Sequence, residues 1–303
     1  MANITAKMVA ELRAKTGAGM LDCKKALTET NGDSAQAVDL LRKKGLSAAA
    51  KKSGRVAAEG LVATVSDGNS CAVVEVNSET DFVAKNDAFM AFVAGVAEVV
   101  LAENPADMDA LMALPFPGTG RTVAEEQTHQ IATIGENISV RRFVRSDVPS
   151  GAVASYVHGN GKIAVSVALQ TAGQNKAVAA PARQVAMHVA AACPQYLNRD
   201  EVPAAVADKE KEIMRAKAID SGKPENIVDK IIAGQINKFF GEVCLLEQVY
   251  VIDTDKKVGK VVEALAKELG TDVTLSEFVR YQLGEGIEKR EDDFAAEVAS
   301  MTN

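Results

Sequence analysis

An internal repeat is the feature that most constrains what this chain can fold into. Residues 60–80, GLVATVSDGNSCAVVEVNSET, align without gaps with residues 151–171, GAVASYVHGNGKIAVSVALQT, at a constant offset of 91 positions. Each copy consists of an alternating run, a turn that contains Gly-Asn, and a second alternating run, a pattern that indicates a β-hairpin. The fold must therefore contain two similar hairpins.

Each hairpin needs further elements, because an isolated two-stranded hairpin is at best marginally stable in water. Ala-rich helical patterns follow the two copies, over residues 86–102 and 177–192. Residues 136–146 can supply a third strand to the first copy, and residues 272–283 can supply one to the second. We therefore predict an α+β fold in which two related core subdomains each combine a small antiparallel sheet with helices.

The chain before the first hairpin is predicted to be helical. Residues 4–45 have the pattern of three short helices, the third with Asp33 as its N-cap and Gly45 as the residue that ends it. Residues 1–55 carry eleven Lys and Arg against five Asp and Glu, although the net charge of the chain is −7. Such a basic unit suits nucleic acid or an acidic protein partner, but it lacks the interleaved aromatic residues typical of nucleic-acid binding.

Two further helical patterns interrupt the second core subdomain. They are joined by Ser221-Gly222-Lys223-Pro224, and glycine after one helix with proline at the start of the next is the expected punctuation. We expect this hairpin to project from the fold, with Ile213 and Ile219 facing its second helix or a partner chain. The predicted parts are residues 1–55 as a three-helix domain with its linker, 56–146 as the first core subdomain, 147–199 with 240–283 as the second, 200–239 as the helical hairpin, and 284–303 as a C-terminal helical module.

Residues that could form a catalytic or metal centre are scattered. His129, His158 and His188 lie far apart in sequence, and the four cysteines show no Cys-X-X-Cys spacing. No apolar run approaches the roughly 18–20 residues of a membrane span, and the N-terminus has no apolar signal-peptide core. We therefore predict a cytoplasmic binding protein rather than an enzyme, with no cofactor, no bound metal and no membrane contact.

The junction between the first hairpin and its helix places an aromatic side chain where polar turn residues are usual. If Thr80 caps a short helical turn, Asp81 lies at the positive end of that turn. Successive helical residues point about 100° apart, so the side chains of Asp81-Phe82-Val83 cannot all face one core. Phe82 either packs in the core against Phe89 and Phe92 or projects from a rigid corner, as interface hot spots do.

Five segments of the chain, taken in order, carry a resemblance to a known family. They are ELRAKTGAGMLDCKKALTETNGD, NSETDFVAKNDAF, IGENISVRR, HVAAACPQYL and GEGIEKREDDFAAEVA. Over essentially the whole chain these segments resemble the bacterial translation elongation factor Ts family, and residues 104–127, which look like a variable insertion, are the least similar part. The resemblance implies a ubiquitin-associated-like N-terminal domain, two related core subdomains, a helical dimerisation arm and a C-terminal helix.

The resemblance also implies a function and a partner. Members of the family are guanine nucleotide exchange factors that bind elongation factor Tu in its GDP form, disturb the binding of Mg²⁺ and phosphate, release GDP and allow GTP to load. The residues that match the family's Mg²⁺-dislocating motif are Thr80, Asp81, Phe82 and Val83. The other expected partner contacts are Leu12, Met20, Leu21, Lys24, Ile134, Gly135, His158 and Val243. The hairpin at residues 200–239 permits a homodimer, and no direct contact with nucleic acid is expected.

Three other classes of function compete with this one. A ubiquitin-associated-like adaptor would bind through residues 1–50 alone and would keep that binding without residues 56–303, whereas an exchange factor would lose most of its activity. An enzyme with a dispersed site has no clustered nucleophile, base or metal ligand in its favour. A nucleic-acid binder is disfavoured by the acidic balance of the chain after residue 55.

Overall fold

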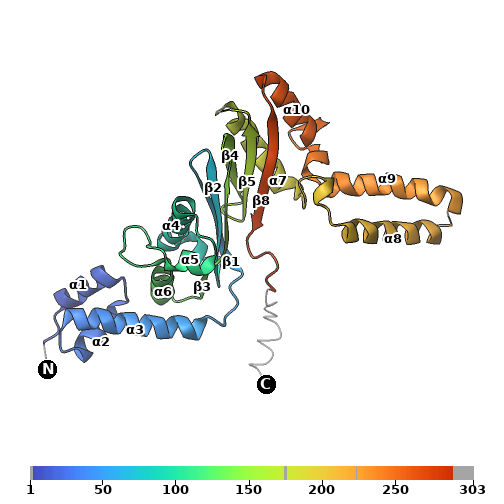
Figure 1. Ribbon diagram of the computed structural model, residues 1–303. Helices are drawn as coiled ribbons and strands as arrows, with labels where there is room; N and C mark the ends of the chain where they lie inside the picture. Colours follow the sequence, from blue (N-terminus) through green and yellow to red (C-terminus); the bar gives the residue numbers. More distant parts are fainter. Residues whose placement is uncertain (1–2, 174–175, 223, 289–303) are drawn as a thin grey trace. The chain divides into compact units, whose positions relative to one another are not determined.

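The computed structural model describes residues 3–173, 176–222 and 224–288 of the 303-residue chain (Figure 1). Helices combined with small antiparallel sheets confirm the predicted α+β class. Among these described residues, no helix is both long enough and apolar enough to cross a membrane. The chain divides into two compact units, the first formed by Met1–Ala63, Val74–Val144 and Tyr281–Asn303 and the second by Thr64–Val73 and Arg145–Arg280.

Three helices begin the first unit, as predicted, and they enclose a small core. The helices are α1 (Ala6–Thr16), α2 (Met20–Glu29) and α3 (Ser34–Lys52). The Asp33 carboxylate accepts the Gln36 N–H at 2.9 Å, which confirms Asp33 as the N-cap of α3. The core that the three helices share consists of Val9, Leu12, Cys23, Ala26, Leu27 and Ala37.

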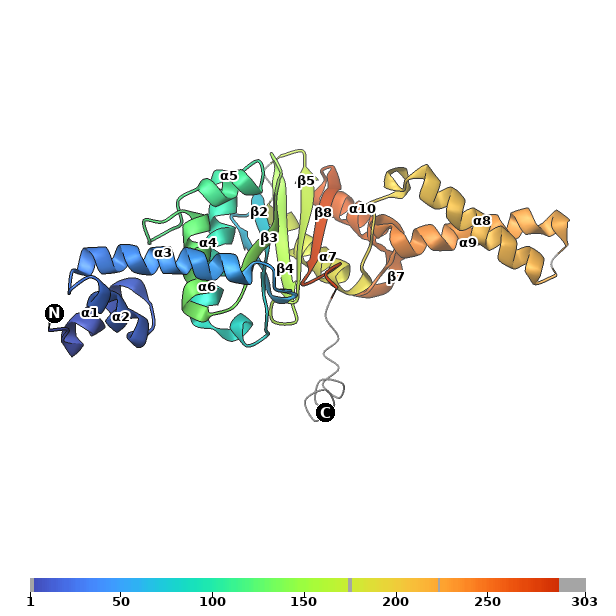
Figure 2. The same cartoon turned by 90° about the horizontal axis from the view of Figure 1, so that it is seen from below.

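The prediction that Gly45 ends the third helix is wrong, because α3 continues through Gly45 to Lys52. Gly45 is buried where α3 lies alongside α6 (Val123–Ile134), as Figure 2 shows. A Cβ atom on Gly45 would lie 3.3 Å from the Cβ of Ala132 on α6. The glycine therefore allows two helices to approach each other closely. In the sequence, a glycine that is present for this reason cannot be told apart from one that ends a helix.

The first hairpin forms the predicted three-stranded sheet of order β1-β2-β3, with the strand that follows in the sequence. These strands are β1 (Glu59–Ser66), β2 (Ser70–Ser78) and β3 (Ile138–Asp147). The helix predicted after the hairpin is α4 (Asp87–Glu103), and it lies beside the sheet together with α6 (Figures 1 and 2). Every residue of β2 is buried, so the central strand is a fixed base for the segment that follows it.

Residues 104–127, which the sequence suggested to be an insertion, form part of this core. They contain α5 (Met108–Ala113), whose Leu111 is fully buried, and they lead into α6 through a capping box between Thr122 and Glu125. The Phe116 ring lies 5.6 Å from the Phe92 ring, centroid to centroid, and it covers Gly95 in the middle of α4. The Phe116 ring thus occupies space beside α4 that a side chain at position 95 would otherwise fill.

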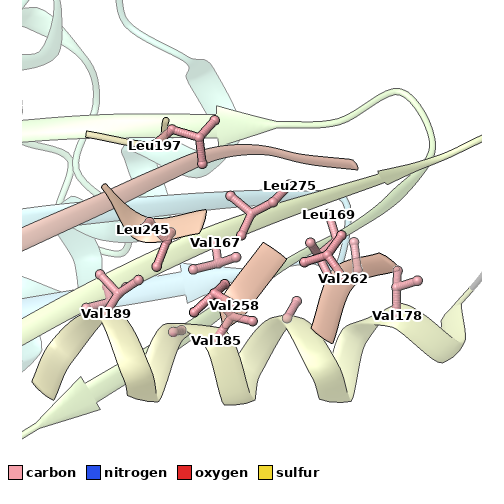
Figure 3. Packing of buried hydrophobic residues seen from close by; sticks show 14 of the residues in the cluster. Val167, Leu169, Val178, Val185, Val189, Leu197, Leu245, Val258, Val262 and Leu275 are labelled. Atoms are coloured by element: carbon pink, nitrogen blue, oxygen red, sulfur yellow. The ribbon is translucent and has the colours of Figure 1, made fainter. Parts of the chain in front are cut away.

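The second hairpin forms an equivalent sheet in the second unit, of order β4-β5-β8, again as predicted. Its elements are β4 (Gly151–His158), β5 (Ile163–Thr171), β8 (Val273–Gln282) and the predicted helix α7 (Ala179–Ala192). Figure 3 shows Val185 and Val189 of α7 packed with Val167 and Leu169 of β5. The same core receives α10 (Val258–Leu269), which follows β6 (Val249–Tyr250) and β7 (Asp253–Lys257) and which the sequence analysis missed.

The repeat is also visible in the backbone. Gly60 and Gly151 occupy the same position in the two copies and have φ values of +122° and +119°. A Cβ atom would lie 2.2 Å from the carbonyl oxygen of Val76 at the first position and 2.0 Å from that of Leu169 at the second. Each copy therefore requires glycine at the point where its first strand starts beside its second.

The predicted helical hairpin is formed by α8 (Ala204–Asp220) and α9 (Glu225–Val243), which run side by side in Figures 1 and 2. Its contact is made by Ala218, Val228 and Ile232, with Met214 packed against them. Ile213 and Ile219 are exposed, so the first of the two alternatives, that they face the second helix, is wrong, and the second, that they face a partner chain, stays a prediction. Of the predicted C-terminal module, residues 289–303 lie outside the described part, and residues 284–286 form a turn.

A buried carboxylate joins three segments of the first unit. Glu75 of β2 is fully buried and accepts hydrogen bonds from Arg141 at 3.0 Å, from Arg142 Nε at 2.6 Å and from the Gly284 N–H at 2.8 Å. Burial by itself would raise the pKa of the Glu75 carboxyl, but these hydrogen bonds outweigh it and hold the pKa below its ordinary value. Glu75 is therefore ionised in the folded protein at neutral pH and fixes the chain after β8 to the first sheet.

We predict that Glu75→Gln destabilises the protein by about 3 kcal/mol at neutral pH, since it leaves two arginines without their buried counter-charge. Because the folded-state pKa is depressed, the contribution of Glu75 is complete above the unfolded pKa of about 4.3 and is lost as the pH falls through the lower folded value. Urea unfolding at several pH values should show that the difference in the free energy of unfolding between the native protein and the variant becomes smaller below about pH 4. The exposed Glu98→Gln is the control, and a difference that does not change with pH would contradict the assignment.

We also predict that Gly95→Ala destabilises the protein by about 1–3 kcal/mol, because overpacking forces a well-packed side chain to move. The added Cβ would lie 2.4 Å from the Cζ of Phe116. Gly234→Ala on α9 is a matched control, since a Cβ there meets nothing within 4 Å and should stabilise the helix by up to about 1 kcal/mol. The comparison is made by urea unfolding, and equal effects of the two changes would show that Phe116 does not close on α4.

Candidate partner-binding surface

The segment between β2 and α4 forms a tight corner with an exposed aromatic ring. A short 3₁₀ turn, Val83–Lys85, follows Phe82, and α4 then begins with Asn86 accepting the Ala88 N–H at 2.9 Å. Val83 is buried and anchors the turn, whereas the Phe82 side chain is 77 % exposed. The core alternative for Phe82 is therefore wrong. The geometry required of an interface hot spot, a rigid base and an outward ring, is present.

Thr80 does not cap the turn, in contrast to the sequence-based expectation. The residue before the 3₁₀ turn is Phe82, with no side-chain cap. The Thr80 hydroxyl instead donates to Glu136 at 2.7 Å, and the Thr80 N–H donates to the same carboxylate at 2.9 Å. In these charge-assisted bonds the Thr80 hydroxyl is a donor directed at Glu136, whereas a helix cap would direct its oxygen at the N–H groups of the turn.

The end of α6 lies beside the corner because Glu136 follows it directly. α6 ends at Ile134, and Gly135 is its C-cap with φ +93°. Ile134 is half-buried and Gly135 is exposed. The structure thus brings two of the predicted groups of residues together, the corner Thr80–Val83 and the helix end Ile134–Gly135.

Lys85 contributes to the corner although the sequence analysis did not select it. Its ammonium lies 3.1 Å from the Asp81 carboxylate and 5.6 Å from the centroid of the Phe82 ring. Asp81 and Lys85 are four residues apart, a spacing that signals pairing on a helical turn. The three side chains form one exposed group in which a cation balances the carboxylate and covers part of the ring.

A second group of predicted residues lies at the start of α2. Met20 and Leu21 are exposed, by 60 % and 72 % of their surfaces, and Lys24 is exposed one turn later. Leu12, which was expected to contact a partner, is 1 % exposed and packs in the core of the three helices. In this structure its side chain supports the three-helix unit from inside.

The remaining two predicted residues belong to the second unit. His158 is exposed at the end of β4, and its Nδ1 lies 2.9 Å from the Tyr156 hydroxyl. Val243, the last residue of α9, is buried with Val202, Ala207 and Cys244. His158 is therefore available to a partner directly, whereas Val243 fixes the base of the helical hairpin.

One group that could perform acid–base chemistry, the imidazole of His188, has a structural role. His188 is fully buried, with its Nε2 at 2.9 Å from the Gln248 side chain and its Nδ1 accepting the Val251 N–H, and burial lowers its pKa. Over the described ranges, no group of three or more His, Cys, Asp or Glu side chains could hold a metal ion. The exposed apolar side chains of Met20, Leu21 and Phe82 lie on helix or turn backbone, an arrangement that suits contact with another protein.

Comparison with known proteins finds relatives that match nearly the whole chain. The sequence model of the family described as "Elongation factor TS" matches residues 79–285. The chain is 70 % identical over 300 residues to elongation factor Ts of Syntrophotalea carbinolica, with 99 % of each chain covered. It is 56 % identical over 304 residues to elongation factor Ts of Trichlorobacter lovleyi and 54 % identical over 298 residues to that of Magnetococcus marinus, with 98 % of each chain covered in both cases.

The different burial of two phenylalanines gives a direct prediction. Phe92→Ala should destabilise the protein by about 3–5 kcal/mol, because Phe92 is 1 % exposed and its loss leaves a cavity. Phe82→Ala should change the free energy of unfolding by less than about 0.5 kcal/mol, as is usual for exposed side chains. Urea unfolding of the two variants checks this, and a large loss with Phe82→Ala would mean that its ring packs inside the fold.

Proposed function

The chain belongs to the elongation factor Ts family, and on that premise we propose that it is the guanine nucleotide exchange factor of elongation factor Tu in translation. It binds elongation factor Tu in its GDP form, disturbs the binding of Mg²⁺ and phosphate, releases GDP and allows GTP to load. It acts by binding rather than by covalent catalysis, so it needs no acid, base or cofactor of its own. Its place of action is the cytoplasm, with no direct contact with nucleic acid or membrane.

The single observation that carries this proposal is the exposed ring of Phe82 on a fixed corner. A phenyl ring suits the role of a wedge because it is large, and because only two side-chain torsions must be frozen on binding. Thr80–Val83 match the family's motif without alteration, and Asp81 lies beside Phe82 where it can compete for groups near the metal. Mg²⁺ joins the nucleotide phosphates to the partner, so a small displacement of its ligands removes much of the nucleotide's binding energy.

Thermodynamic linkage relates the affinity of elongation factor Tu for GDP to its affinity for this protein. If this protein weakens the affinity of elongation factor Tu for GDP by some ratio, GDP weakens the affinity for this protein by the same ratio. The exchange factor therefore gains contact energy with the nucleotide-free partner and loses it when nucleotide returns. The complex is strong enough to displace GDP and is itself displaced by GTP.

The other predicted residues give this contact further points of attachment. Met20, Leu21 and Lys24 offer an exposed apolar pair and a cation on α2, which suits an acidic partner surface with an apolar centre. Ile134 and Gly135 adjoin the corner, and His158 offers a contact from the second unit. Leu12 and Val243 act from inside the fold, by supporting the surfaces above them.

The helical hairpin formed by α8 and α9 is proposed to mediate a homodimer. Ile213, Ile219 and Ile227 remain exposed on it, by 37–56 % of their surfaces, which supports a role in association. In a complex without a homodimer, the helical hairpin would lie beside elongation factor Tu.

We predict that Phe82→Ala lowers the rate of exchange by tenfold or more, a loss of about 1.4 kcal/mol or greater. The measurement is release of fluorescent GDP from purified elongation factor Tu, with and without this protein. Val249→Ala removes a similarly exposed apolar side chain from the second unit and should leave the rate unchanged. Unchanged GDP release with Phe82→Ala would rule out the wedge, and no acceleration by the native protein would rule out the function.

A further inference from the structure

We propose that Glu136 is a positioning residue, which fixes the corner Thr80–Val83 to the end of α6 so that both are presented as one rigid surface. This inference rests on the proposed function for its effect on exchange. The structural part, that Glu136 immobilises the corner, stands on the geometry of the first unit alone. The two parts are therefore tested separately.

The Glu136 carboxylate uses both of its oxygens on a single residue. Oε2 accepts the Thr80 N–H at 2.9 Å, and Oε1 accepts the Thr80 hydroxyl at 2.7 Å. The Thr80 carbonyl oxygen accepts a third hydrogen bond, from the Ser78 hydroxyl at 3.0 Å. Every polar group of Thr80 thus has a partner. The backbone is held fast at the residue directly before Asp81 and Phe82.

The bonding is reciprocal between two pairs of adjacent residues. While Glu136 accepts from Thr80, the neighbouring Glu79 carboxylate accepts the Asn137 N–H at 2.6 Å. Each chain segment therefore supplies one carboxylate and one backbone donor, as in a capping box, but between residues more than fifty positions apart. Bonds of this kind are stronger than those between neutral groups, and two of them in opposite directions prevent one segment from sliding past the other.

A third segment closes the arrangement on its other side. The Asn137 side chain, which is buried, donates to the Arg55 carbonyl oxygen at 2.8 Å. The Arg55 guanidinium lies 3.4 Å from the Glu79 carboxylate. The linker after α3, the end of β2 and the end of α6 are thereby held at one point.

The consequence lies in the free protein, before any partner arrives. Ordering the backbone of a residue and freezing a side chain both oppose binding, and a segment that is already ordered avoids that loss. Asp81 and Phe82 are exposed, and besides their contacts with the exposed Lys85 the fold holds them through the residues on either side, Thr80 and the buried Val83. Glu136 itself need not touch the partner to matter.

The immobilising role is tested without the partner. The chain contains no tryptophan, so Phe82→Trp introduces a single fluorescent reporter at the tip of the corner. Adding Glu136→Ala should lower the anisotropy of this indole and increase its quenching by acrylamide. Glu136→Gln should restore both, because its amide oxygen can accept the Thr80 N–H while its amide nitrogen donates to the Thr80 hydroxyl. Asp107→Ala, which removes the cap of α5 from the Ala110 N–H, is the control and should change neither.

The effect on exchange is tested by a double-mutant cycle with release of fluorescent GDP from elongation factor Tu. Glu136→Ala alone should slow exchange by about tenfold, but it should add little in the Phe82→Ala background, since it acts through Phe82. Glu136→Gln should keep most of the rate. If Glu136→Ala does not fold, Glu79→Ala is used in its place. It removes the carboxylate that accepts the Asn137 N–H and should also slow exchange.

The possible failures are distinguishable. Unchanged anisotropy with Glu136→Ala overturns the immobilising role, whatever the exchange assay gives. Independent, multiplying effects of Glu136→Ala and Phe82→Ala on the exchange rate overturn the second part, that Glu136 acts on exchange through Phe82. If Phe82→Ala leaves exchange intact, the wedge role of Phe82 fails, and if the native protein does not accelerate GDP release, the proposed function fails. In both cases the anisotropy still decides whether Glu136 fixes the corner.

Discussion

The buried carboxylate of Glu75 is the interaction on which the first unit depends. It lies in the middle of a strand that is buried along its whole length, and it binds two arginines of β3 and the backbone of Gly284. A charge in such a place is stable only while all its partners are present, so it specifies one arrangement of these segments. The strand that carries Glu75 ends at Ser78, and the candidate surface begins two residues later.

An exposed aromatic ring brings no stability to the fold, so the fold must hold it by other means. Here the corner is bounded by the hydrogen-bonded Thr80 on one side and by the buried Val83 and the start of α4 on the other. The positions that hold the ring and the ring itself are different residues. Stability and binding can consequently be altered by separate substitutions, which is why the effects of Phe82 and Phe92 are expected to diverge.

Local pattern predicted the elements whose cause is local. Alternation with Gly-Asn turns predicted both hairpins, and the glycine–proline punctuation predicted the helical hairpin. Features caused by distant residues could not be found in this way. Gly45 lets α3 approach Ala132 of α6 closely and does not end a helix. Thr80 donates to the Glu136 carboxylate and does not cap the turn that follows it. Phe82 was undecided because periodicity has no meaning within a corner, and only the resemblance favoured its exposure.

The hydroxyl of Thr64 lies 3.0 Å from that of Ser155, and these two residues occupy the same position in the two copies of the repeat. Ser66 likewise donates to the carbonyl oxygen of Val153, on the strand that carries Ser155. The two copies of the repeat therefore contact each other at equivalent positions. Because the two sides of this contact are separate residues of one chain, a substitution at one leaves the other unchanged, and here the two differ as threonine and serine.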